Sequence, residues 1–296
     1  MSEISGNAPR VGFVGFGEAG QAFACGMALA DSGRAAAYDL KSRDPAAAPA
    51  MAAHYAAAGL PGSGDPAQAL AGAELVFCLV TADQAGAAAA ACANHIAPGT
   101  YWFDGNSCAP GSKRAAAEQI EAAGGRYVDM AIMAPVHPRL HRTPVLLAGP
   151  HAEPAAALLA ALDMAPKIAG ATVGEASAIK MIRSVMVKGL EALTAECFLA
   201  ARRAGVDAAV LGSLMASDPG IDWPARGAYN LERMMVHGAR RAAEMTEVAA
   251  TLRELGLPDR MAAATVAWQA DIAALGLEAG EADLAARSDR ILAGLG

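Results

Sequence analysis

The chain has 296 residues, which exceeds one average domain and allows a large buried core. Hydrophobic residues make up 54% of it, but much of that is alanine, and no segment approaches the roughly 20 strongly apolar residues of a membrane helix. The net charge of −7, without any basic stripe, argues against nucleic acid as a partner. The N-terminus lacks the basic and apolar regions of a secretory signal, and the five cysteines show no C-x-x-C spacing. We therefore expect a cytoplasmic protein with reduced thiols and no membrane partner.

A glycine fingerprint follows the first apolar run, residues 10–14, which suits a buried strand. Its sequence is Gly15-Phe16-Gly17-Glu18-Ala19-Gly20. Gly15 suits the tight turn, Gly17 a close approach of the backbone to a pyrophosphate, and Gly20 close packing of the next helix on the strand. The free N–H groups at the start of that helix point toward anionic phosphates. The pattern predicts a dinucleotide site.

Asp39 bears on the choice of cofactor because it ends the second expected strand, residues 35–38. A carboxylate at that position accepts hydrogen bonds from both ribose hydroxyls and repels a 2′-phosphate, which favours NAD. Lys41 and Arg43 lie close enough in sequence to reach a 2′-phosphate if Asp39 turned away. NADP therefore stays open as the alternative cofactor.

Strands and helices alternate as far as about residue 170. The expected strands are residues 10–14, 35–38, 75–80, 100–103, 126–130, 144–148 and 167–169. The expected helices between them are residues 18–32, 45–58, 83–95, 110–124 and 153–162, with a Gly/Pro loop at residues 59–65. After Glu175 the pattern changes to long helical stretches broken near residues 205, 219–220 and 256–258. This predicts a Rossmann-type α/β domain with a mostly parallel, doubly wound sheet at residues 1–172, then an all-α substrate and dimerisation domain at residues 173–296.

Two loops follow expected parallel strands at their carboxyl ends, where open α/β sheets bind ligands. One is Asp104-Gly105-Asn106-Ser107, and the other is Leu79-Val80-Thr81. Asn and Ser also occur in such turns for backbone reasons alone, and that reading remains an alternative.

The start of the long helix completes the set of motifs with Lys180-Met181-Ile182-Arg183-Ser184. In its order of parts the whole chain resembles the β-hydroxyacid dehydrogenase superfamily, which includes 6-phosphogluconate and 3-hydroxyisobutyrate dehydrogenases. The resemblance implies an NAD(P)-dependent oxidoreductase that transfers hydride between nicotinamide and a small, anionic hydroxy or keto substrate. It implies that Lys180 is the catalytic acid/base. It also implies that Asn106 and Ser107 lie near the nicotinamide and substrate, and that Leu79, Val80 and Thr81 line the cofactor ribose.

Elementary chemistry gives Lys180 the same role. An alcohol that loses hydride must also lose its hydroxyl proton, so a base within about 3 Å of that oxygen is required. A partly desolvated lysine near a positive helix end has a lowered pKa and serves as that base. Spacing by four places Lys180, Ser184 and Lys188 on one helix face. There we expect Ser184 to position the substrate hydroxyl, and Lys188 either to hold an anionic group or to lower the pKa of Lys180 further. An ordinary exposed helix lysine is the alternative.

The chain departs from the superfamily where a Ser-Gly-Gly substrate loop is usual. It carries Met133-Ala134-Pro135 there, so backbone and hydroxyl donors for a carboxylate are partly lost. Arg183 and Ser184 replace the histidine and asparagine that follow the lysine in 6-phosphogluconate dehydrogenases. The departures point to a divergent branch with a 6-phosphogluconate-dehydrogenase-like C-terminal domain.

Two basic clusters are further candidates for binding the substrate. His137 opens the run His137-Pro138-Arg139-Leu140-His141-Arg142, which either binds a carboxylate or phosphate or forms a solvated loop. His237 shares a helical face with Arg233 and Glu244, which is either an anion site or a surface network of charge pairs. We expect no metal, because Pro138 disfavours a regular helix and no carboxylate or cysteine accompanies the two histidines of the run.

Two other functions stay open. An imine reductase that uses NADPH shares this architecture but usually lacks the lysine, and a non-catalytic protein would bind NAD(H) through the same glycines. The apolar, alanine-rich helices of the second half indicate a homodimer.

Overall fold

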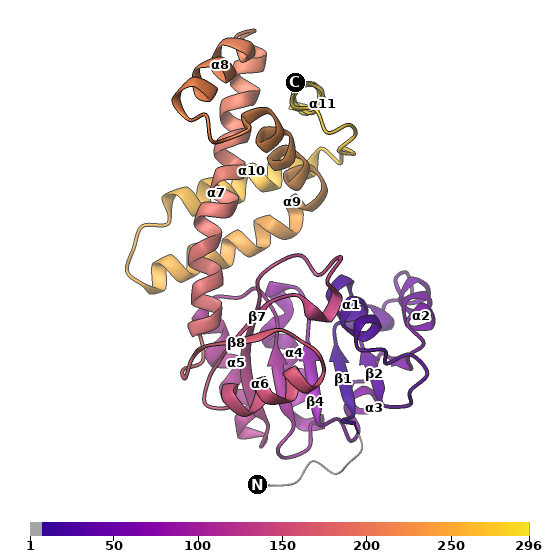
Figure 1. Ribbon diagram of the computed structural model, residues 1–296. Coiled ribbons are helices and arrows are strands. Elements are labelled where there is room, and N and C mark those ends of the chain that lie inside the picture. The colour runs from indigo at the N-terminus through magenta and orange to yellow at the C-terminus, as the bar shows by residue number, and fades with distance from the viewer. Residues whose placement is uncertain (1–7, 296) are drawn as a thin grey trace. The chain divides into compact units, whose positions relative to one another are not determined.

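The structure, a computed structural model, describes residues 8–295. The chain divides into two compact units, one ending at Lys180 and the other starting at Met181 (Figure 1). The boundary falls within the long helix α7 (Glu175–Arg203). The first unit carries the sheet and the second is all-helical, so the predicted fold class is confirmed.

One eight-stranded sheet, in the order β3-β2-β1-β4-β5-β6-β7-β8, organises the first unit. Its strands are β1 (Val11–Val14), β2 (Ala35–Tyr38), β3 (Gly62–Ser63), β4 (Leu75–Cys78), β5 (Tyr101–Asp104), β6 (Arg126–Ile132), β7 (Val145–Ala148) and β8 (Pro166–Gly170). Neighbouring strands are parallel except β6 and β7. The order reverses between β1 and β4, which is the crevice where doubly wound sheets bind ligands.

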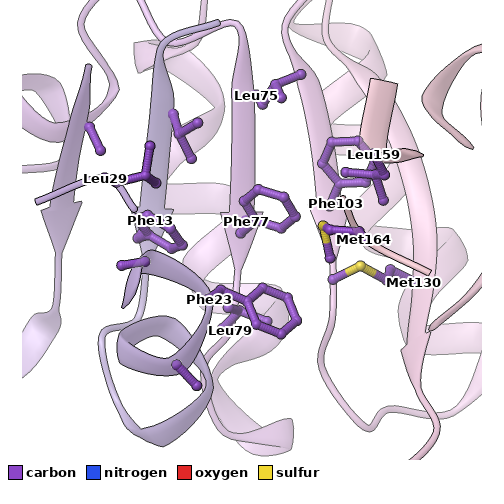
Figure 2. Close-up of a cluster of buried hydrophobic side chains, with 14 of the residues drawn as sticks. Phe13, Phe23, Leu29, Leu75, Phe77, Leu79, Phe103, Met130, Leu159 and Met164 are labelled. Carbon is purple, nitrogen blue, oxygen red and sulfur yellow. The ribbon is translucent and has the colours of Figure 1, made fainter. Parts of the chain in front are cut away.

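Helices cover both faces of this sheet because successive strand residues point to opposite sides. The α-helices of the unit are α1 (Glu18–Gly26), α2 (Ala48–Ala57), α3 (Pro66–Leu70), α4 (Ala85–Cys92), α5 (Pro110–Ala122) and α6 (Ala152–Ala161). Short 3-10 helices are η1 (Leu40–Arg43), η2 (Ala82–Gln84), η3 (Ala93–His95) and η4 (Leu140–Arg142). Phe13, Phe77 and Phe103 belong to one apolar core (Figure 2), while Val14 and Trp102 belong to the core on the opposite face.

Element bounds differ from the prediction in several places, and a short strand, β3, lies inside the loop expected at residues 59–65. Helix α1 ends at Gly26 rather than residue 32, and Ala28 just beyond it adopts a left-handed backbone with φ of 52°. The helix expected at residues 83–95 is three consecutive pieces, η2, α4 and η3. The short helix α3 was not predicted, although Asp65 accepts a hydrogen bond from Ala67 N at 3.0 Å and Pro66 occupies the first turn, both common at helix starts.

The second unit holds the rest of α7 with α8 (Asp207–Ser217), α9 (Trp223–Glu254), α10 (Arg260–Ala274) and α11 (Leu284–Leu295). The breaks between the helices α7 to α10 fall at the predicted positions. Phe198, Leu231, Met234, Ile272 and Ile291 form part of its core. Among residues 8–295, no helix has the length and apolar character needed to cross a membrane.

Candidate cofactor and catalytic site

The glycine loop between β1 and α1 has three glycines with distinct surroundings. Gly15 has a φ of +83°, and a Cβ there would lie 2.5 Å from the carbonyl oxygen of Leu79. A Cβ on Gly20 would lie 2.8 Å from the carbonyl oxygen of Gly15, so the helix packs directly on the turn. A Cβ on Gly17, by contrast, would meet no protein atom within 4 Å. Packing within the protein therefore explains why Gly15 and Gly20 have no side chain, but it does not explain the absence of one at Gly17.

The other residues of the loop divide between core and surface. Phe16 is buried, with its ring centroid 5.8 Å from that of Phe13 and 5.3 Å from that of Tyr55. Glu18 is exposed and Ala19 half-buried in the first turn of α1. Phe16 anchors the loop, and the free N–H groups of the helix start lie beside the exposed Gly17.

Asp39 lies next to this loop at the carboxyl end of β2. Its Oδ2 accepts a hydrogen bond from Phe16 N and its Oδ1 one from Lys41 N, both at 2.9 Å. The side chain is half-buried, whereas Lys41 and Arg43 are exposed, and Arg43 Nε donates to the carbonyl of Gly64. Two backbone donors thus hold the carboxylate in place, and each oxygen keeps a lone pair for a further donor.

Asn106 ties the ends of β4 and β5 together. Its Oδ1 accepts from Val80 N at 2.7 Å, and its Nδ2 donates to Asp104 Oδ1 at 2.7 Å and to Cys78 Sγ at 3.3 Å. Leu79 is buried, Val80 half-buried and Thr81 exposed. Since both ends of its amide are engaged, Asn106 holds together the two loops predicted to meet the cofactor.

Lys180 and Ser107 meet within the first unit. Lys180 Nζ donates to Ser107 Oγ at 2.7 Å, and both side chains are half-buried. Ser107 follows β5, and Lys180 lies in the second turn of α7. An amine and a hydroxyl in contact at the carboxyl edge of a parallel sheet can pass a proton to or from a bound oxygen.

A buried charged cluster next to Ser107 was not predicted. Lys113 Nζ donates to Asp104 Oδ1 at 2.9 Å and lies 3.6 Å from Asp129 Oδ1, and Tyr127 donates its hydroxyl to Asp104 Oδ2 at 2.7 Å. Burial favours the neutral amine, but Asp104 and Asp129 outweigh it and raise the pKa of Lys113. Burial and Asp104 raise the pKa of Tyr127 well above its usual value. The signal in the sequence was polar residues at buried positions, namely aspartates in apolar strands and a lysine on the buried face of α5.

The remaining predicted residues on the helices lie in the second unit. Lys188 is buried and contacts Glu244 Oε2 at 2.8 Å and Ser184 Oγ at 3.3 Å. Arg183 is exposed, and His237 is half-buried, with a pKa lowered by burial and by neighbouring arginines. The ammonium of Lys188 is thus already paired with a carboxylate.

The run at residues 137–142 does not gather its basic groups at one point. His137 is exposed, and Arg142 pairs with Asp163. His141 is buried, and burial together with Arg142 lowers its pKa. Met133 is half-buried and packs on a small cluster that includes Ala176 of α7.

Two family descriptions match the chain. Residues 10–174 match the NAD binding domain of 6-phosphogluconate dehydrogenase, and residues 201–272 match a domain of unknown function, DUF1932. A comparison with curated proteins gives no match.

Solved structures resemble the chain over most of its length. A conserved hypothetical protein from Sinorhizobium meliloti 1021 is 38% identical, with a TM-score of 0.76 over 98% of this chain and 97% of that one. The 3-hydroxyisobutyrate dehydrogenase of Mycobacterium tuberculosis, with L-serine, is 17% identical, with a TM-score of 0.71 over 96% and 98%. A reductive aminase from Aspergillus terreus, with NADPH4, cyclohexanone and allyl amine, is 19% identical, with a TM-score of 0.54 over 96% and 99%. The last two likenesses concern the fold alone. With more than half of its length matched by one description, the chain belongs to the family that carries the NAD binding domain of 6-phosphogluconate dehydrogenase.

Proposed function

We propose that this chain is an NAD(P)-dependent oxidoreductase of the β-hydroxyacid dehydrogenase type, with Lys180 as the acid/base. The observation that carries the proposal is the 2.7 Å contact between Lys180 Nζ and Ser107 Oγ, in the unit that also holds the glycine fingerprint. The contact places an amine at the carboxyl edge of the parallel sheet, where folds of this kind bind their ligands.

The loop residues fit a nicotinamide dinucleotide. Gly17 leaves space beside the start of α1, where backbone N–H groups favour a diphosphate. Asp39 is held at the end of β2, with lone pairs left for ribose hydroxyls. Because a carboxylate there repels a 2′-phosphate, we propose NAD as the preferred form. When bound, the nicotinamide supplies the hydride acceptor or donor.

The residues of this chain handle the proton. Lys180 takes the hydroxyl proton of an alcohol during oxidation and returns it during reduction. Ser107 Oγ, already in contact with Nζ, orients that amine and accepts or donates a hydrogen bond to the substrate oxygen. We propose a small hydroxy or keto substrate that carries an anionic group.

The test combines cofactor titration with a substrate panel. Purified protein is titrated with NADH and NADPH and then assayed with 3-hydroxy acids, 2-keto and 3-keto acids, and cyclic imines. Lys180→Ala is expected to bind the reduced cofactor as the wild type does and to lose at least about 100-fold in turnover. Lys167→Ala, at an exposed lysine of β8, is the matched control. Unchanged turnover in Lys180→Ala would remove Lys180 from the mechanism.

An imine reductase is the second candidate, favoured by the fold similarity to the reductive aminase. Reduction of an imine also needs a proton donor, and the panel separates the two activities directly. Turnover of cyclic imines but of no keto acid would favour this candidate. Cofactor binding without turnover of any panel member would favour a nucleotide-sensing protein.

We also propose that the protein is a homodimer. Helix α7 carries a row of exposed apolar side chains in the second unit, with Ile182 at 48%, Met186 at 65% and Leu193 at 56% exposed. Such a row on a helix is typical of a subunit contact. Light scattering of the wild type and of Met186→Glu tests this: a dimer that becomes monomeric supports the contact, and a monomeric wild type contradicts it.

A further inference from the structure

We infer that Lys113 is a positioning residue that joins the loop carrying Ser107 to the helix carrying Lys180. The inference rests on the proposed function for its catalytic meaning, but the structural link is testable by itself. Lys113 lies on α5 and is fully buried. Its hydrogen bonds go to Asp104, so it acts on the candidate site through its neighbours.

On one side, Lys113 fixes the loop after β5. Its Nζ donates to the carbonyl oxygen of Asp104 at 2.6 Å and to Asp104 Oδ1 at 2.9 Å. The same Oδ1 accepts from the backbone N of Asn106 at 3.0 Å and from its Nδ2 at 2.7 Å. The ammonium therefore sets the position of Asp104, Asp104 sets that of Asn106, and Ser107 is the next residue along the chain.

On the other side, Lys113 faces the start of α7 through Asp129. Nζ lies 3.6 Å from Asp129 Oδ1. Asp129 Oδ2 accepts from Gly174 N and Ser177 N, both at 3.0 Å. Gly174 immediately precedes α7 and Ser177 lies in its first turn, where backbone N–H groups have no partner within the helix. Ser177 lies three residues before Lys180, so the carboxylate holds the turn from which the catalytic amine extends.

The charges of this cluster explain why it needs a lysine. Asp104 and Asp129 are both buried, with 1% and 0% exposed, and lie on adjacent strands in register. Two buried carboxylates repel each other, and the single ammonium between them compensates part of that charge. The N-terminal end of α7 carries a partial positive charge, which compensates a further part of the negative charge of the two carboxylates. Neutralising Lys113 thus releases both carboxylates, one from each half of the candidate site.

Hydrogen exchange tests the link without any enzymatic activity. In Lys113→Met, amide exchange is expected to rise at least tenfold in both residues 104–108 and residues 174–180, while α2 on the far edge of the sheet stays unchanged. Lys167→Met is the control. A rise in only one of the two segments, or an equal rise in α2, would overturn the inference. If Lys113→Met does not fold, Lys113→Gln replaces it, because a neutral amide removes the positive charge while keeping a polar side chain. The same two segments must respond.

A double-mutant cycle tests the catalytic meaning. Turnover per bound cofactor is measured in Lys113→Met, Lys180→Ala and the double variant, with the cofactor affinity of each. We expect Lys113→Met to lower turnover at least tenfold in the wild-type background and less than twofold once Lys180 is absent, with cofactor affinity unchanged. Equal factors in both backgrounds would mean a general structural role and overturn the inference. If Lys180→Ala loses activity but Lys113→Met keeps full turnover, the inference about Lys113 is overturned and the proposed function stands. A wild type without turnover would refute the proposed function, and hydrogen exchange would still decide the link.

Discussion

The variant Gly17→Asp tests whether glycine is required at position 17 for binding the cofactor or for the backbone of the turn. The backbone at Gly17 is extended, with φ of −78° and ψ of −155°, and so lies outside the left-handed region that favours glycine; a Cβ there would have no neighbour within 4 Å. Gly17 is also the N-cap of α1, with no side-chain cap at present. Aspartate is a better N-cap than glycine by a few tenths of a kcal/mol, so the free energy of unfolding is expected to stay the same or rise slightly.

The effect on the cofactor is the opposite. For a carboxylate at residue 17 and a diphosphate bound at the start of α1, a separation on the order of 5 Å is used for the Coulomb energy. At an effective dielectric constant of about 20, two unit charges at that distance repel by about 3 kcal/mol. This corresponds to a loss of about 100-fold in affinity. Gly17→Asn has nearly the same shape without the charge and measures the steric part separately.

The assay is calorimetric titration of NADH and NADPH into the wild type and both variants, with urea unfolding of each. The expected pattern is unchanged stability in all three proteins, weaker binding in Gly17→Asn and the weakest in Gly17→Asp. Equal affinity in wild type and Gly17→Asp would refute the assignment of this loop to the cofactor. A large loss of stability in both variants would refute the inference that Gly17 has room around it.

Three further predictions concern stability and are read from urea unfolding. Gly15→Ala is expected to lower the free energy of unfolding by about 3 kcal/mol or more, because a Cβ would lie 2.5 Å from a carbonyl oxygen. The control Gly33→Ala, where φ is +67° but the space is open, is expected to lower it by about 1 kcal/mol. Equal losses in the two variants would contradict the predicted clash at Gly15. Arg241→Met leaves Glu191, only 2% exposed, without its ion pair and is expected to cost about 3–5 kcal/mol; a loss below about 1 kcal/mol would contradict this. The pKa of His141 is lower in the folded protein than in the unfolded chain, so the unfolded chain binds a proton at this residue more tightly, and stability falls as pH drops below about 6.5. His141→Gln is expected to flatten that part of the pH–stability profile. An unaltered profile would exclude His141 as the source of the fall.

Periodic patterns made the fold predictable from the sequence. The glycine fingerprint, the apolar runs of four to six residues and the glycines after helices located most strands and helix breaks. The end of α1 was wrong because Ala28 adopts a left-handed backbone that alanine does not favour. Ala28 N donates to Cys25 O at 3.0 Å and Leu29 N to Ala24 O at 3.2 Å, which ends the helix there. Helix α3 was missed because a five-residue helix has too little periodicity to stand out from a Gly/Pro loop.

The candidate site was predictable only where its residues belong to motifs. Lys180 and Ser107 are 73 positions apart, and their contact depends on strand order and on the angle at which α7 begins. Asp129 was marked in the sequence only as a polar residue in an apolar strand, and a lysine such as Lys113 is ordinarily a surface residue. That the two side chains pair depends on how α5 packs on the sheet, so their pairing was accessible only after the fold.

The position of the unit boundary inside α7 has a consequence for modular use of this protein. A fragment cut at residue 172 would keep every strand but would leave Asp129 without the two N–H groups it caps, and it would lack Lys180. An autonomous nucleotide-binding piece must therefore retain the opening turns of α7 through Lys180. The same restriction applies to chimaeras that take their C-terminal half from a relative. The two chains have to be joined within α7 after Lys180, in phase with the rotation of the helix per residue. A join in the loop before α7 would replace Lys180 together with the helical unit.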